Sequence, residues 1–96
     1  MGLEERFKKY GMEYGKFNLV KNKLSTRRDL TVFLILDKLL IEERNIICIA
    51  ECDFIFFDID DADAELIAED DIIDLCRCGV FYDTCECSLA MPVKFM

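Results

Sequence analysis

The longest apolar run of the chain extends from Leu30 to Ile41 and organises the predicted fold. Before it, Thr26 and Asp29 have the spacing of a helix-capping box, and charged residues occupy positions 42–44 after it. The pattern predicts a long central helix over residues 26–44. The helix should be buried on most sides, because little of its circumference is polar. Its predicted buried stripe consists of Leu30, Phe33, Leu34 and Ile41, flanked by Val32, Leu36, Leu39 and Leu40.

Shorter helices are predicted on both sides of this run. Leu3, Phe7 and Tyr10 recur at near-helical spacing and predict a helix over residues 3–10 that ends at Gly11. Acidic residues open a second helix at residues 69–71, and Gly79 has the position of its C-terminal stop. Residues 45–52 allow two interpretations, a short helix capped by Asn45 or the first half of a long strand to position 58. We prefer the helix.

Three strands are predicted in the second half of the chain. Residues 54–59 form the first, and residues 80–82 pair with residues 87–91 across a loop of residues 83–86. In this hairpin Val80 lies opposite Leu89, and Tyr82 lies opposite Cys87. The predicted fold is therefore α+β: a three-stranded antiparallel sheet packed on the long central helix, with two or three shorter helices.

Charge is distributed unevenly along what we predict to be a single domain of 96 residues. Residues 1–28 hold eight Lys or Arg and three Glu, a net charge of +5, whereas residues 29–96 hold four basic and seventeen acidic residues, a net charge of −13. We divide the domain into a basic N-terminal segment, residues 1–24, and an acidic core, residues 25–96. The opposite charges also allow two copies to associate as a homodimer.

Several classes of protein are disfavoured by the sequence. The charged N-terminus lacks the apolar segment of a secretory signal, and the longest apolar run is shorter than the about 20 residues that span a bilayer, so we expect a cytoplasmic protein with no membrane partner. The chain contains no His, which excludes Ser-His and Cys-His catalysis. It also lacks a glycine-rich phosphate loop. We therefore expect no enzymatic activity and no cofactor.

Acidic residues are concentrated in one stretch of seventeen positions that contains no Lys or Arg. The nine candidate partner-binding residues are Asp58, Asp60, Asp61, Asp63, Glu65, Glu69, Asp70, Asp71 and Asp74. A calcium-binding EF-hand fits poorly, because Ala62 occupies a ligand position and Asp63 the position that requires Gly. Two interpretations stay open: a solvated face that keeps an apolar domain in solution, or a surface that docks on a basic groove normally occupied by phosphates.

Two C-x-C pairs offer an alternative based on metal binding. Four thiolates, from Cys76, Cys78, Cys85 and Cys87, could close a tetrahedral zinc site. On a helix, however, Cys76 and Cys78 would point about 200° apart. Only a strand would bring both to one face, so this small structural zinc domain remains the alternative function.

Three stretches of the chain, residues 25–30, residues 50–53 and residues 69–83, together resemble small acidic proteins encoded in prophages and mobile elements of Gram-positive bacteria. The resemblance carries no catalytic residues to transfer. It implies a setting in which small acidic proteins bind and block a host protein, as anti-CRISPR and anti-restriction inhibitors do.

The leading prediction is a non-catalytic protein-binding module of phage or mobile-element type. Its acidic residues would mimic DNA and occupy the basic surface of a host nucleic-acid-binding protein. The basic N-terminal segment carries interleaved aromatic residues that could stack on single-stranded nucleic acid. The attached charge of −13 disfavours direct nucleic-acid binding, because it would repel a phosphate backbone.

Overall fold

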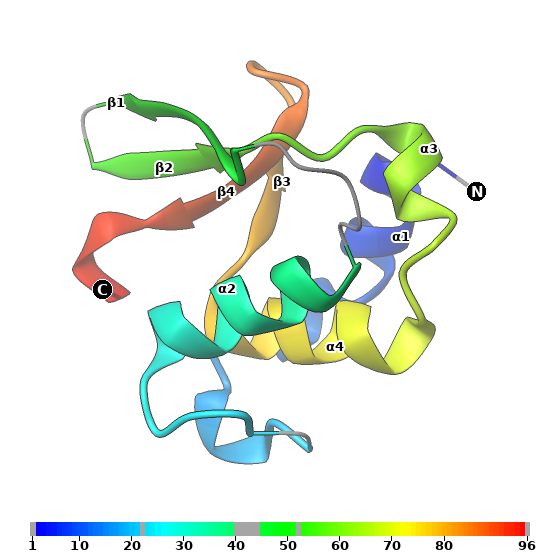
Figure 1. The fold of residues 1–96 in the computed structure, drawn as a ribbon. Coiled ribbons are helices and arrows are strands. Elements are labelled where there is room, and N and C mark those ends of the chain that lie inside the picture. The colour runs from blue at the N-terminus through cyan, green and yellow to red at the C-terminus, as the bar shows by residue number, and fades with distance from the viewer. Residues whose placement is uncertain (1, 22, 40–44, 52, 96) are drawn as a thin grey trace.

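The fold was analysed in a computed structural model, which describes residues 2–21, 23–39, 45–51 and 53–95. In these residues four strands form one antiparallel sheet in the order β1-β2-β4-β3, and the helices gather on one side of it (Figure 1). The strands are β1 (Ile47–Glu51), β2 (Phe54–Phe57), β3 (Phe81–Asp83) and β4 (Ser88–Pro92). The helices are α1 (Leu3–Lys9), α2 (Arg28–Leu39), α3 (Asp61–Ala64) and α4 (Glu69–Cys78), with short 3₁₀ segments η1 (Gly11–Glu13), η2 (Phe17–Leu19) and η3 (Val93–Phe95). None of these described helices is long and apolar enough to cross a membrane.

The two faces of the sheet have different roles. Because side chains alternate along a strand, Phe57, Leu89 and Met91 point toward the helices and are buried in the core. On this inner face Phe33 of α2 meets Phe57 edge to face, with ring centroids 5.9 Å apart. The opposite, outer face carries Phe54 of β2. The α+β class is thus confirmed, with four strands rather than three.

The described part of helix α2 is shorter than predicted, and the helix buries a different face. It begins at Arg28 rather than position 26, and residues 40–44, where we expected its end, lie outside the described residues. Its buried positions are Thr31, Val32, Ile35 and Leu36, whereas Leu30 and Leu34 of the predicted stripe are 45% and 37% exposed. Thr31 can be buried because its hydroxyl donates to the Ser25 carbonyl at 3.1 Å. The prediction of a long central helix covered on most sides was wrong.

The first strand of the sheet was the main error of the prediction. Residues 47–51 form β1, which pairs with β2 so that Glu51 lies opposite Phe54 and Ala50 opposite Ile55. The preferred helical interpretation was wrong because cross-strand pairing overrides the weak capping signal of Asn45. All five residues of β1 are exposed, as expected for a strand at the edge of the sheet.

Other predicted elements are confirmed. Helix α4 spans residues 69–78 and ends at Gly79, whose left-handed φ of 109° favours glycine. The β3–β4 hairpin forms, but Tyr82 lies opposite Leu89 instead of Cys87. The Asp83 carboxylate accepts from the backbone N–H groups of Cys85 and Glu86 at 2.8 and 3.1 Å, which moves the loop one residue along the chain. This two-residue slip keeps each side chain on its predicted face.

Candidate functional site

The predicted acidic residues do not form one exposed surface, and Asp74 is the clearest exception. Its side chain is 1% exposed and accepts the backbone N–H of Lys21 at 3.0 Å. This hydrogen bond joins α4 to the segment that follows η2. Asp74 was therefore wrongly included among the partner-binding residues, because a buried carboxylate that holds the chain together cannot also face a partner.

The acidic first turn of α4 contacts basic residues of the same chain. Lys9 Nζ lies 3.2 Å from a carboxylate oxygen of Glu69, and the Tyr10 hydroxyl donates to the same oxygen. These two contacts, the Tyr10 hydrogen bond first, lower the pKa of Glu69. Asp71 lies 3.9 Å from Lys38 Nζ on α2. Part of the opposite charge that the sequence separates is thus paired within the molecule, whereas Asp70 of the same turn is exposed.

The remaining predicted acids surround α3 and define what we call the α3 acidic surface: Asp58, Asp60, Asp61, Asp63 and Glu65. Four of them are exposed and Asp63 is half-buried. Among the described residues, no Lys or Arg lies within salt-bridge distance of Asp58, Asp60, Asp61 or Glu65. Figure 1 places α3 at a corner of the molecule beside α1. This is the part of the predicted site that the structure brings together.

Local hydrogen bonds fix the α3 acidic surface. Asp60 and Asp63 form a reciprocal capping box, in which each carboxylate accepts the backbone N–H of the other at 2.9 and 3.1 Å. Asp61 accepts the backbone N–H of Leu3 at 2.9 Å. Arg6 of α1 donates to the carbonyl groups of Ala64 and, at 2.7 Å, Ile67. These contacts attach the acidic helix to α1.

The four cysteines proposed for zinc lie in two different environments. Cys76 and Cys78 are buried in α4, and burial raises the pKa of each thiol to about 12, so both stay protonated at neutral pH. Cys85 and Cys87 are exposed in the β3–β4 loop. The described part of the chain contains no group of three side chains placed to hold a metal. The zinc alternative therefore has no preformed site there.

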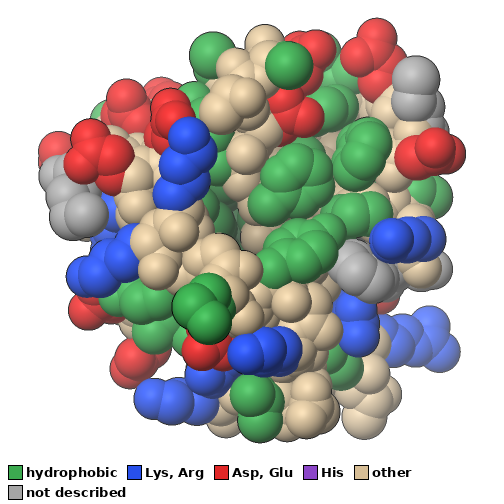
Figure 2. All heavy atoms as spheres, turned by 180° about the vertical axis from the view of Figure 1, so that it is seen from behind, with side chains coloured by type: hydrophobic (Ala, Val, Ile, Leu, Met, Phe, Trp, Pro, Cys, Tyr) green, Lys and Arg blue, Asp and Glu red, His purple; other side chains and the backbone are tan. Residues whose placement is uncertain are grey.

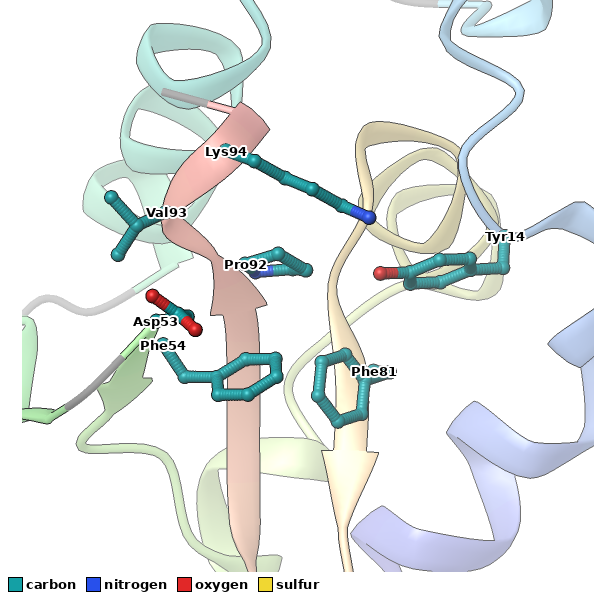
Figure 3. Close-up of a pocket in the computed structure, with 7 residues that line it drawn as sticks. All are labelled: Tyr14, Asp53, Phe54, Phe81, Pro92, Val93 and Lys94. Carbon is teal, nitrogen blue, oxygen red and sulfur yellow. The ribbon is translucent and has the colours of Figure 1, made fainter.

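An open pocket of about 910 Å³ on the outer face of the sheet was missed by the sequence analysis. Its apolar wall consists of Phe54, Phe81, Pro92 and Val93, closed on one side by Tyr14 (Figure 3). Phe81 meets Phe54 edge to face at 5.8 Å between ring centroids, and meets Tyr14 in the same manner at 6.0 Å. Seen from behind, the molecule shows apolar side chains gathered near the middle of one face, with charged side chains around them (Figure 2).

Backbone hydrogen bonds hold the walls of this pocket in place. The N–H of Val93 donates to the Asp53 carbonyl at 2.7 Å, which joins the end of β4 to the β1–β2 turn. The N–H of Gly15 donates to the Cys76 carbonyl at 3.0 Å and anchors the segment that carries Tyr14. The described lining of the pocket thus comes from four separate chain segments, at position 14, positions 53–54, position 81 and positions 92–94.

Two charged residues, Asp53 and Lys94, also line the pocket. Figure 3 shows the Lys94 side chain extending across the pocket toward the Tyr14 hydroxyl, while the Asp53 carboxylate lies beside Phe54. Burial raises the pKa of Tyr14, and the nearby Arg28 guanidinium opposes that effect. The Tyr14 phenol is therefore a hydrogen-bond donor at neutral pH. An apolar wall with a donor and a cation at one end suits a ligand that has one polar end.

Comparisons of the chain with protein-family models, with curated proteins and with solved structures found no match. The relation to small acidic proteins of prophages and mobile elements therefore stays a prediction. The two candidate functional features of the described residues are the α3 acidic surface and the outer-face pocket.

Proposed function

We propose that this chain is a non-catalytic protein-binding module that docks the α3 acidic surface on the basic surface of a partner protein. The observation that supports the proposal is the group of exposed carboxylates around α3, four of which have no described Lys or Arg within salt-bridge distance. The net charge of −8 adds long-range attraction to a basic partner. The sequence resemblance supports a host nucleic-acid-binding protein as that partner, which would make the chain an anti-CRISPR-like or anti-restriction-like inhibitor.

The density of charge around α3 is compatible with mimicry of DNA. A stretch of six positions, residues 60–65, contains four acids: Asp60, Asp61, Asp63 and Glu65. A helix rises about 1.5 Å per residue. Duplex DNA carries one negative charge per about 1.7 Å of its axis. The spacing of carboxylates along α3 is of the same order, so a groove lined with Lys and Arg would meet a comparable field.

The α3 acidic surface is also prepared for binding before a partner arrives. The capping box and the Leu3–Asp61 hydrogen bond restrict three of the five carboxylates, so less conformational entropy is lost on docking than with free side chains. The same hydrogen bonds use only some of the lone pairs that an ionised carboxylate offers. The remaining lone pairs can accept from Lys or Arg of a partner.

The experiment compares two triple variants of equal charge in a pull-down from an extract of a Gram-positive host. In the test variant Asp60, Asp61 and Asp63 become Asn, which removes three charges while keeping an acceptor oxygen for every hydrogen bond described above. The control variant, D37N/E51Q/E86Q, removes three charges from exposed acids elsewhere. We expect the test variant alone to lose the partner, and a short DNA duplex to release the partner from the unmodified protein.

Salt gives an independent measurement. Raising the salt concentration from about 0.05 M to about 0.5 M shortens the screening length severalfold and should release the partner. A partner that stays bound at high salt, or that both triple variants retain equally, would show that the α3 acidic surface is not the docking surface. A partner that is retained in the presence of excess DNA would refute the mimicry of DNA specifically.

A further inference from the structure

The outer-face pocket has two chemically different ends. At one end the Lys94 side chain reaches across the opening toward the Tyr14 hydroxyl, so that an ammonium group and a phenol face the same space (Figure 3). On the other side, the rings of Phe54 and Phe81 and the ring of Pro92 form an apolar wall. A ligand that fits both ends must be apolar over most of its length and carry an acceptor at one end.

The size and rigidity of the pocket suit a small molecule. Its volume of about 910 Å³ lies within the range of about 300–1,000 Å³ that is typical of ligand pockets. The edge-to-face packing of Tyr14, Phe81 and Phe54 fixes the rings against one another. Together with the backbone hydrogen bond between Val93 and Asp53, this packing gives a cavity that exists before the ligand arrives.

The electrostatics of the pocket are opposite to those of the whole chain. Although the net charge is −8, Lys94 lies at the Tyr14 end of the pocket. Burial raises the pKa of Tyr14, and the Arg28 guanidinium is close enough to oppose part of that rise. Asp53 is the acid among the described residues of the lining, and its carboxylate lies beside Phe54. An anionic group is therefore attracted to one end and repelled from the other, which fixes the orientation of an amphipathic anion.

From this arrangement we infer that the pocket binds an amphipathic carboxylate, either an alkyl or an aryl monocarboxylic acid. The carboxylate lies between the Lys94 ammonium and the Tyr14 hydroxyl, and the alkyl or aryl part lies against Phe54, Phe81 and Pro92. This site is separate from the α3 acidic surface, and the inference does not depend on the proposed docking function.

Calorimetric titration of the full chain with matched ligand pairs tests the inference. The probes are octanoate against octanol, and phenylbutyrate against phenylbutanol, so that each pair differs at the polar end. We expect saturable one-to-one binding of both carboxylates, with the alcohols roughly tenfold weaker because they lack the charge-assisted hydrogen bonds. Ring resonances of Tyr14, Phe54 and Phe81 should shift during the titration, which assigns the heat to this pocket.

Four substitutions separate the two ends of the pocket. Lys94→Gln should reduce carboxylate affinity to that of the alcohol and leave alcohol affinity unchanged, whereas Lys38→Gln on α2 removes the same charge and should change neither. Asp53→Asn should tighten carboxylate binding, because it removes the repulsive charge. Val93→Trp, at a position that is 42% exposed and so tolerant of a larger ring, should fill the pocket and abolish binding of both classes.

Three results would overturn the inference. The first is the absence of saturable heat with either carboxylate, and the second is equal affinity for carboxylates and alcohols that Lys94→Gln does not change. The third is binding accompanied by shifts confined to residues outside the pocket. Far-UV circular dichroism of each variant verifies that a loss of binding is not a loss of fold.

Discussion

Arg6 offers the sharpest test of how the α3 acidic surface is held. Its guanidinium donates to the carbonyl groups of Ala64 and Ile67, at the end of α3 and in the segment before α4, and so connects α1 to both. The arginine is half-buried. Without it the Ile67 carbonyl would have to be satisfied by water, whereas the Ala64 carbonyl still accepts the backbone N–H of Ile67 at 3.2 Å. Arg6→Met removes the charge and both hydrogen bonds but keeps most of the apolar stem.

The expected loss of stability follows from these contacts. A hydrogen bond to a charged group contributes about 1.5–3 kcal/mol, and partial exposure places each of the two bonds near or below the lower limit. The methionine side chain is less restricted in the folded state than the bonded arginine, which offsets part of this loss. Arg6→Met should therefore reduce the free energy of unfolding by about 2–3 kcal/mol. For a domain of this size that corresponds to a decrease in Tm of roughly 10–20 °C.

Urea unfolding followed by far-UV circular dichroism measures the effect, with Lys8→Met as the matched control. Lys8 lies on the same helix and pairs with Glu4 at 2.5 Å, but both side chains are exposed, so its loss should cost only about 0.3–0.5 kcal/mol. Arg6→Lys keeps the positive charge but loses the planar guanidinium, so its loss of stability should lie between those of Arg6→Met and Lys8→Met. If Arg6→Met and Lys8→Met shift the urea midpoint equally, Arg6 does not clamp α1 to α3.

Three further predictions concern buried and paired groups. Asp74→Ala should lower the free energy of unfolding, measured in urea, by about 2–4 kcal/mol, because it removes the acceptor of the part-buried Lys21 N–H and leaves a cavity where the buried carboxylate was; a loss below about 1 kcal/mol would contradict its structural role. A hydrogen bond from Arg77, at 2.9 Å, lowers the pKa of Glu13 below its ordinary value of 4.5. The stability from this pair is therefore complete above that pH and is lost as the pH falls through the folded pKa. Urea midpoints between about pH 3 and pH 6 should decline less steeply for Glu13→Gln than for the unmodified protein, and identical slopes would refute the linkage. Alkylation by iodoacetamide near pH 8, followed by mass spectrometry, should label the exposed cysteines of the β3–β4 loop and spare Cys76 and Cys78, whose thiol pKa values are raised to about 12 by burial. Equal labelling of both groups in the folded protein would show that α4 is not packed as described.

The elements that the sequence predicts well are those specified by local signals. Helix α4 has acids in its first turn and a glycine in the left-handed conformation at its end, and both signals act within a few residues. Strand β1 could not be predicted in the same way, because its conformation depends on pairing with β2 rather than on its own residues. The buried face of α2 was predicted wrongly for a related reason. Burial of Thr31 depends on a hydrogen bond to Ser25, which apolar periodicity does not reveal.

The candidate sites show the same limit. Clustering in the sequence identified the acids around α3, since residues 58–65 are adjacent in any fold. Clustering could not show that Asp74 is buried. The available signal is helical spacing: Asp74 lies one turn before Cys78 on α4, and both side chains are buried. The outer-face pocket depends on the strand order β2-β4-β3 and on Tyr14 from a distant segment. In the sequence, Phe54 and Phe81 each lie in a predicted strand, but nothing there indicates that the two side chains meet.

The basic and acidic parts of the sequence are partly paired with each other in the folded chain. Lys9 of the N-terminal segment contacts Glu69 of α4. The Glu13–Arg77 pair has the opposite polarity, with the acid in the N-terminal segment and the base on α4. Arg6 donates to the carbonyl groups of Ala64 and Ile67, and among the described residues no Lys or Arg lies within salt-bridge distance of Asp60, Asp61 or Glu65. The α3 acidic surface therefore places four exposed acids around α3, at a corner of the molecule beside α1. A variant with α1 displaced should expose additional acids on α4 and lose the rigidity of the α3 acidic surface, so partner affinity and domain stability should decrease together in Arg6→Met.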